Sequence, residues 1–163
     1  MNIQKRVPFV SVVGKKKSGK TTLIERLVSS LKLEGYKVGV MKYDVREFQI
    51  DYKGKDTYRY YQSGADIVVI SSQEKVASIR RLKASPPLGE LLHTHFSDAD
   101  IVLIEGYKAD DCPKIFLIDP GEEPSLRGKK DCLVLIKRDQ DGHSSNYIEK
   151  ALHFLKGLLQ DRK

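Results

Sequence analysis

The chain has 163 residues, of which 40% are hydrophobic and 31% charged, as in an ordinary folded protein. The net charge of +7 would suit a nucleic-acid partner, but the sequence contains neither an aromatic–basic RNA motif nor a helix-turn-helix pattern. We therefore expect no nucleic-acid partner. No apolar run approaches membrane-spanning length and the first residues lack a signal-peptide segment, so we expect no membrane partner. We expect a single domain over residues 1–163, whose basic balance suits a polyanionic nucleotide or an acidic partner protein.

A glycine- and lysine-rich stretch follows the first predicted strand. Residues 9–13 are apolar and rich in β-branched side chains, which favours a strand. Leucines one helical turn apart predict a helix over residues 18–34, ending at Gly35. Between them, residues 14–21 read GKKKSGKT and fit G-x-x-x-x-G-K-[ST] at every fixed position. The motif therefore stands between a strand and a helix, as a phosphate-binding loop must.

This motif predicts a nucleotide-phosphate site with defined roles. Glycines let the backbone turn its N–H groups inward, and those groups with the helix start form a concave anion site. Lys20 can reach the β- and γ-phosphates, and the Thr21 hydroxyl can ligate Mg²⁺. Lys15, Lys16 and Lys17 are interpreted as a source of general positive charge that attracts anions. The alternative is that Lys15 or Lys16 contacts a phosphate directly, across a dimer interface. The predicted nucleotide-binding residues are Gly14, Lys15, Lys16, Lys17, Ser18, Gly19, Lys20, Thr21 and Thr22.

The remaining elements alternate between strands and helices. A short strand at residues 36–41 precedes a polar, tyrosine-rich stretch at 42–64, within which Asp56 caps a predicted helix at 56–62. The other predicted strands are residues 67–70, 75–79, 101–104, 114–118 and 132–136, and the other predicted helices are residues 87–96 and 144–159. Strands that are apolar throughout are buried on both faces, as in parallel sheets. The chain is therefore expected to form a three-layer α/β P-loop NTPase fold with a mostly parallel central sheet.

Carboxylates after two of these strands are candidates for Mg²⁺ and catalysis. Glu105 ends an apolar strand, where P-loop proteins place a carboxylate that holds Mg²⁺ or its waters. Asp44 and Asp51 follow the second strand, where a switch segment often lies, and either could ligate Mg²⁺ or orient water. The predicted metal set is Thr21, Asp51 and Glu105, and the predicted catalytic set is Lys20, Asp51 and Glu105.

A possible base-reading turn follows the last predicted strand. Guanine-specific P-loop proteins often carry [NT]-K-x-D at such a place, and the Asp accepts hydrogen bonds from the guanine. Here Lys137 and Asp139 match, but Ile136 replaces the Asn or Thr. A charged turn that contacts no nucleotide explains these residues equally well.

Several stretches together resemble the MobB proteins, P-loop proteins of molybdopterin guanine dinucleotide biosynthesis. The resemblance covers roughly residues 9–118 and, more weakly, 137–139. Its specific parts are Phe48-x-Ile50-Asp51-x-x-Gly54-Lys55-Asp56-Thr57 and Glu105-Gly106-Tyr107-Lys108. The family often has histidines where Tyr43, Asp44 and Val45 stand, and a proline where Lys53 stands.

The resemblance implies a cytoplasmic GTP-binding protein with slow, Mg²⁺-dependent GTPase activity. It implies a homodimer that assists a MobA-like guanylyltransferase, which joins GMP to molybdopterin; molybdopterin itself is a further candidate ligand. Two alternatives come from other classes. A small P-loop metabolite kinase would need a lid, for which Arg80 and Arg81 are candidates. A ParA-like ATPase would use Lys15 across a dimer, although that family usually has glycine where Lys16 and Lys17 stand.

Overall fold

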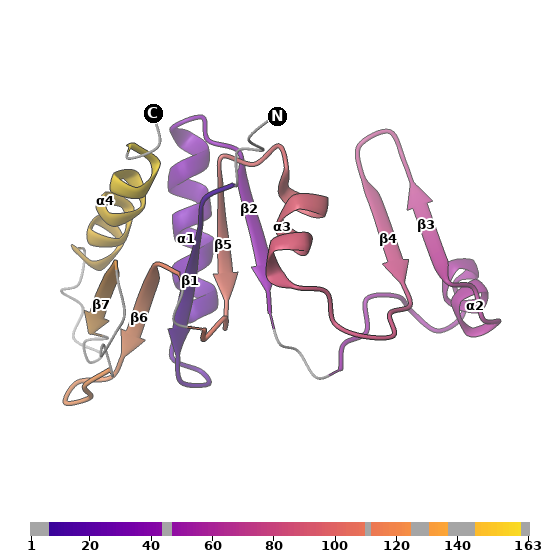
Figure 1. Ribbon diagram of the computed structural model, residues 1–163, viewed down its shortest axis with the longest axis horizontal. Helices are drawn as coiled ribbons and strands as arrows, with labels where there is room; N and C mark the ends of the chain where they lie inside the picture. The colour runs from indigo at the N-terminus through magenta and orange to yellow at the C-terminus, as the bar shows by residue number, and fades with distance from the viewer. Residues whose placement is uncertain (1–6, 44–46, 110–111, 125–130, 137–145, 161–163) are drawn as a thin grey trace. The chain divides into compact units, whose positions relative to one another are not determined.

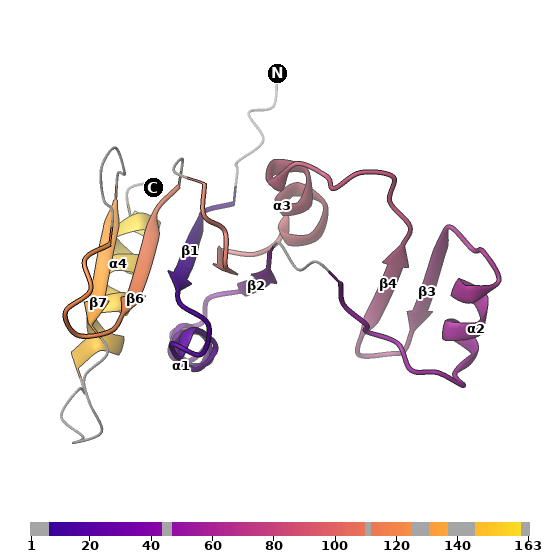
Figure 2. The same cartoon turned by 90° about the horizontal axis from the view of Figure 1, so that it is seen from below.

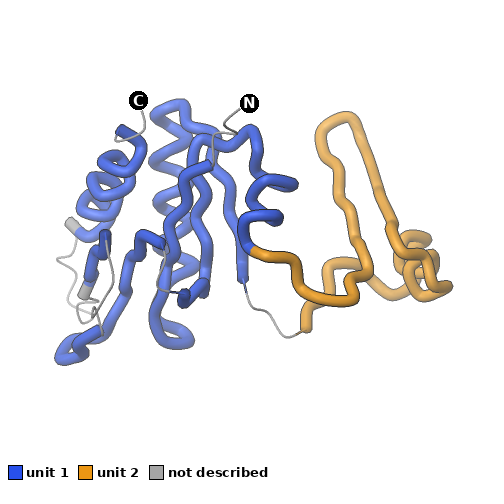
Figure 3. The backbone as a smooth tube through the Cα atoms, viewed as in Figure 1, with its two compact units in different colours: residues 1–44, 88–163 blue, residues 45–87 orange. Residues whose placement is uncertain are grey.

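The computed structural model describes residues 7–43, 47–109, 112–124, 131–136 and 146–160. The chain divides into two compact units (Figure 3). Unit 1 comprises residues 1–44 and 88–163, and unit 2 comprises residues 45–87. The expectation of one domain over the whole chain stays a prediction. Within the described residues, no helix is both long and apolar enough to cross a bilayer.

Unit 1 is built on a five-stranded sheet whose neighbouring strands all run parallel (Figure 1). The strands are β1 (Phe9–Gly14), β2 (Val38–Lys42), β5 (Ile101–Glu105), β6 (Lys114–Ile118) and β7 (Cys132–Ile136). Their order in space is β2-β5-β1-β6-β7, with β1 in the middle. The predicted parallel sheet is confirmed, and the carboxyl ends of all five strands meet at one edge.

Helices cover both faces of this sheet, which confirms the three layers. α1 (Lys20–Leu33) and α4 (Asn146–Gln160) lie on one face, and α3 (Leu88–Phe96) lies on the other (Figure 2). The larger core packs α1 and α4 against alternate residues of β1, β5, β6 and β7. The smaller core packs α3 against Val102 and Ile104 of β5. β5, which lies between β2 and β1, is therefore buried on both faces, and Ile101, Val102, Leu103 and Ile104 are all inaccessible to solvent.

Unit 2 holds α2 (Asp56–Gln62) and an antiparallel hairpin of β3 (Ile67–Ser71) and β4 (Val76–Arg80). Residues 67–70 form the predicted strand, but they do not join the parallel sheet. A continuous apolar run does not distinguish a doubly buried strand from one in a small hairpin, because period-2 alternation is absent in both. The predicted cap of α2 is wrong: Lys55 is the N-cap residue, and Asp56 lies in the first turn, where its charge favours the helix dipole.

Element boundaries otherwise agree with the sequence to within about two residues, the usual ambiguity of helix and strand ends. The helix predicted over 18–34 spans Lys20–Leu33, because residues 14–19 form the loop. Strands 114–118 and 132–136 have the predicted bounds. The last helix is observed from Asn146, and residues 144–145 of its prediction lie outside the described residues.

A glycine in β2 lets α3 approach the sheet. A Cβ atom at Gly39 would lie 2.9 Å from Cε1 of Phe96, closer still to its Cδ1, and 3.2 Å from Cγ2 of Val102. Phe96 ends α3 and packs against the β5 residues Val102 and Ile104. Phe96 therefore occupies the space that a side chain at residue 39 would fill.

We predict that Gly39→Ala destabilises the protein by about 1–2 kcal/mol, because an added methyl in a filled core forces neighbours to shift. Urea unfolding followed by circular dichroism measures this. Gly157→Ala is the matched control: nothing lies within 4 Å of a Cβ atom there. Gly157 lies in the interior of α4, so alanine should stabilise by about 0.5–1 kcal/mol. Equal effects of the two substitutions would contradict the proposed fit of Phe96.

Candidate functional site

The phosphate-loop motif begins at Gly14, the last residue of β1, where β1 pairs with β6. Gly14 pairs in register with Leu117, and a Cβ atom at Gly14 would overlap the Leu117 carbonyl oxygen. It would also lie 2.8 Å from the hydroxyl of Ser18. Only glycine fits this position, so the chain can leave the sheet sharply and enter the loop.

The start of α1 is open to an anion. Gly19 is the N-cap residue with φ of 91°, a left-handed conformation that glycine adopts without strain. Among the described residues no side chain caps this helix end, and its first turn contains no acidic residue. Several backbone N–H groups of the first turn are therefore available to a ligand, and the helix dipole favours negative charge there.

Lys20 lies over the loop that it follows. Its Nζ donates hydrogen bonds to the carbonyl oxygens of Gly14 at 3.1 Å and Lys15 at 2.6 Å. The ammonium group is thereby held beside the loop's inward-facing backbone, where a phosphate would need it. The predicted nucleotide residues from Gly14 to Thr22 thus lie together in one loop and the first turn of α1, as their sequence positions require.

The structure brings Thr21, in the first turn of α1, together with Glu105, at the end of β5. The Thr21 hydroxyl donates to Oε2 of Glu105 at 3.4 Å, although 84 positions separate the residues. β5 pairs with β1 in parallel, and Glu105 lies opposite Val12 near the end of β1. Its backbone is fixed on both sides: the Glu105 carbonyl accepts from the Tyr43 N–H, and the next N–H, of Gly106, donates to Val12.

Two oxygen donors at the phosphate loop fit a magnesium ion. Mg²⁺ prefers oxygen ligands and commonly takes one or two from protein, with waters and substrate phosphates completing six. Among the described residues, no group of three or more His, Cys, Asp or Glu side chains could hold a metal. Thr21 and Glu105 offer two of the oxygen ligands that an ion shared with a nucleotide would need.

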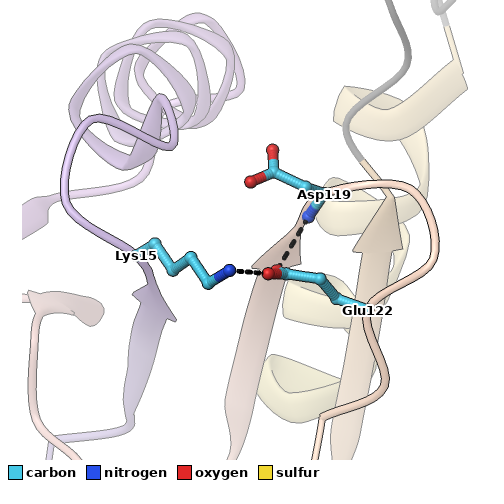
Figure 4. Close-up of polar contacts among 3 residues, drawn as sticks. All are labelled: Lys15, Asp119 and Glu122. Atoms are coloured by element: carbon cyan, nitrogen blue, oxygen red, sulfur yellow. Dashed lines mark hydrogen bonds and ion pairs between the residues drawn. The ribbon is translucent and has the colours of Figure 1, made fainter.

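The three loop lysines differ in their surroundings. Lys15, Lys16 and Lys17 are all exposed. Lys15 forms an ion pair with Glu122, which follows β6, and the other carboxylate oxygen of Glu122 accepts from the Asp119 N–H at 3.2 Å (Figure 4). Lys17 has a positive φ of 64°, uncommon for a residue with a side chain. The ion pair between Glu122 and Lys15 could not be predicted from the sequence. In a loop with several charged residues, the sequence does not indicate which carboxylate will pair with a given lysine.

The remaining predicted site residues lie in unit 2 or outside the described residues. Asp51 belongs to unit 2, where one carboxylate oxygen accepts from the Tyr52 N–H and the other is buried without a hydrogen-bond partner among described residues. Lys137, Asp139 and Asp44 lie outside the described residues. Arg81, a candidate lid residue, donates to backbone carbonyls of Tyr61 and Ala65 within unit 2.

Two buried polar residues that sequence reasoning missed hold the segment after Glu105. Ser11, fully buried in β1, donates its hydroxyl to the Tyr107 carbonyl. Lys114, only 1% exposed at the start of β6, donates to the carbonyls of Ala109 and Cys112. Both residues are polar and stand in otherwise apolar strands, which is the signal that could have identified them. A buried polar group needs a hydrogen-bond partner, so such a residue is expected to hold a neighbouring segment.

Comparison with known proteins agrees with this geometry. The family model of molybdopterin guanine dinucleotide synthesis protein B, MobB, matches residues 9–138. The molybdopterin-guanine dinucleotide biosynthesis adapter protein of Haemophilus influenzae is 33% identical over 114 residues, 69% of this chain and 64% of that protein. The match thus spans less than two thirds of that relative. The adapter protein of the same name from Escherichia coli is 30% identical over 122 residues, 71% of this chain and 67% of that protein.

A solved structure extends the likeness to the fold. The crystal structure of a molybdopterin-guanine biosynthesis protein B superposes with a TM-score of 0.70 at 32% sequence identity. The superposition covers 93% of this chain and 99% of that one. With the family model matching well over half of the sequence, the chain belongs to the MobB family.

Proposed function

We propose that this protein is a GTP-binding adapter in the biosynthesis of molybdopterin guanine dinucleotide. It binds Mg²⁺–GTP in the phosphate loop, hydrolyses it slowly, and assists a MobA-like guanylyltransferase in the cytoplasm. The contact between Thr21 and Glu105 at the mouth of the loop carries the nucleotide and Mg²⁺ part of this proposal. The biosynthetic role rests on family membership and on the names of the relatives.

The strand order is compatible with a base-reading turn after β7. β7 runs parallel to β6, which runs parallel to β1, so β7 ends at the edge of the sheet where β1 enters the phosphate loop. The segment that contains Lys137 and Asp139 begins directly after β7. A base-reading Asp in that segment would therefore start from the correct edge.

We predict that the protein binds a slowly hydrolysed GTP analogue more tightly than the corresponding ATP analogue, and only weakly without Mg²⁺. Isothermal titration with each analogue measures both preferences. Lys20→Ala should weaken GTP binding by about tenfold to a hundredfold, because it removes a charge-assisted contact to phosphate. Lys150→Ala is the matched control, since Lys150 is an exposed lysine on α4. A folded Lys20→Ala protein with wild-type affinity would argue against this site.

We predict that Glu105→Gln slows GTP hydrolysis by about tenfold and changes GTP affinity by less than about threefold. Binding energy comes mainly from backbone N–H groups and Lys20, while Mg²⁺ matters most where charge develops during phosphoryl transfer. Single-turnover hydrolysis and equilibrium binding on one preparation separate these effects. Asp100→Asn, at the other end of β5, is the matched control. If Glu105→Gln hydrolyses GTP at the wild-type rate across a Mg²⁺ titration, Glu105 has no catalytic role, and Asp51 or Asp44 becomes the better candidate.

The hairpin of unit 2 supports the proposed homodimer. Ile67, Val69 and Val76 lie on one face of it and are 46%, 56% and 68% exposed. A two-stranded hairpin is marginal in water unless its apolar face is covered, so a second copy of this chain is a suitable partner.

We predict that Val69→Asp weakens dimerisation in sedimentation equilibrium, because a buried carboxylate would have to lose its water. Gln73→Asp adds the same charge at the exposed hairpin turn and should leave the association unchanged. A wild-type protein that sediments as an 18.5 kDa monomer at all concentrations would contradict the dimer.

A further inference from the structure

A cavity of about 410 Å³ lies between α1 and the carboxyl half of β2. Thr21 lines it at the start of α1, and Glu105 lines it at the edge of the sheet. The last residue of β2, Lys42, lines the same cavity. The cavity therefore joins the two predicted magnesium ligands to a lysine that the phosphate-loop motif does not contain.

The register of the sheet fixes Lys42 beside Glu105. β2 pairs with β5 in parallel, with Lys42 opposite Glu105 and Val40 opposite Leu103 (Figure 1). Neighbouring strands lie about 4.8 Å apart. The backbone just beyond Lys42 is held as well, because the N–H of Tyr43 donates to the Glu105 carbonyl at 3.0 Å. The backbone of Lys42 is therefore held one strand away from that of Glu105.

The side chains of Lys42 and Glu105 lie on the face of the sheet that α1 covers. Val38 of β2 and Leu103 of β5 belong to the core that packs against α1. Because side chains alternate along a strand, Lys42 lies on the same face as Val38, and Glu105 on the same face as Leu103. The hydroxyl of Thr21, in the first turn of α1, donates to Glu105 on this face. Three polar side chains from three elements thus line one cavity at the carboxyl edge of the sheet.

Lys42 has the charge that a phosphate ligand requires, and its side chain is exposed. Within the described part of the chain Lys42 forms no ion pair, although it stands beside Glu105. The Glu105 carboxylate accepts from Thr21 instead. The aliphatic side chains of Ile24 and Val28 form part of the cavity wall, and fewer waters beside a charge screen it less. An anion at this end of the cavity would therefore meet a lysine whose charge no described carboxylate neutralises.

Lys20 and Lys42 reach the mouth of the phosphate loop from different strands. The Lys20 ammonium group is held over the loop by two of its carbonyl oxygens. The loop follows β1, Lys42 ends β2, and β5 with Glu105 lies between them. In a loop of this kind the backbone N–H groups hold the α- and β-phosphates, so the terminal phosphate is the one that extends beyond them. It is therefore the phosphate that a lysine on β2 can contact.

We propose that Lys42 is a further catalytic residue of the nucleotide site, and that its ammonium group contacts the terminal phosphate of bound GTP. Water forms a bond to the γ-phosphorus, the bond from that phosphorus to the β–γ bridging oxygen breaks, and one proton of the water passes to solvent. Lys42 stabilises the negative charge of the transferring phosphoryl group and takes up no proton itself. The inference rests on the proposed function, which it deepens by naming a residue that distinguishes GTP from GDP.

Nucleotide titrations with Mg²⁺ test this contact independently of hydrolysis. Lys42→Ala should weaken binding of a slowly hydrolysed GTP analogue by about tenfold and change GDP affinity by less than about twofold. Lys20→Ala should weaken both, because Lys20 reaches the β-phosphate as well. Lys37→Ala is the matched control and should change neither affinity. Lys37 is an exposed lysine just before β2, and its backbone N–H, which the substitution keeps, donates to Asp100.

Single-turnover hydrolysis measures the catalytic effect. Lys42→Ala should slow the chemical step by about a hundredfold, since a donor directed at developing charge typically contributes that much. Lys42→Arg keeps a positive charge at the same place, so it should bind the GTP analogue within about threefold of the wild-type affinity.

The inference is overturned if Lys42→Ala binds the GTP analogue as the wild type does, or loses GTP-analogue and GDP affinity in equal proportion. A wild-type rate of hydrolysis in Lys42→Ala overturns it too, as does Lys42→Arg binding as weakly as Lys42→Ala. In these cases the wild-type protein still binds GTP, so the proposed function survives. If the wild type prefers the ATP analogue, the guanine proposal fails, and the same comparison against ADP decides the role of Lys42. A wild type that binds neither triphosphate overturns both.

Discussion

The approach of β1 to β6 at Gly14 is the constraint on which the site depends. The Leu117 carbonyl occupies the space that any side chain at Gly14 would need. The backbone can therefore turn at the end of β1 and place α1 with its open N-terminus toward the same edge of the sheet. On the other side of β1, β5 delivers Glu105 to this edge in fixed register. One strand in the middle of the sheet thus positions both the start of α1 and the carboxylate of Glu105.

The parts of this arrangement that are local in sequence could be predicted. The loop between residues 9–13 and the first helix follows from a motif in which every fixed position has a steric or electrostatic role. The position of Glu105 could also be predicted. An apolar strand is expected to be buried in the sheet, so a carboxylate that ends such a strand is expected at the edge of the sheet. Family membership agrees with the resemblance carried by Glu105-Gly106-Tyr107-Lys108 and by the stretch around Asp51.

The parts that depend on pairing partners could not be predicted. Residues 67–70 have the composition of a doubly buried strand, yet they pair antiparallel with β4 outside the central sheet. Asp56 has the chemistry of a helix cap, but the helix begins one residue earlier than that role requires. Lys15 meets Glu122, and Ser11 meets Tyr107, only because β6 and β5 flank β1. The sequence pattern alone does not indicate which strands lie next to one another in the sheet.

The parallel pairing of β1 with β5 also sets the order in which the protein can become functional. Ser11 and Ile104 are 93 positions apart in the chain, yet they are in register in the sheet. Contacts between distant residues form slowly, because a long loop must close before they give any stability. A chain that emerges from the ribosome therefore carries the complete phosphate-loop motif long before Glu105 has been synthesised. During synthesis, Thr21 can meet Glu105 only after β5 has entered the sheet, so this contact forms late although the motif itself is complete early.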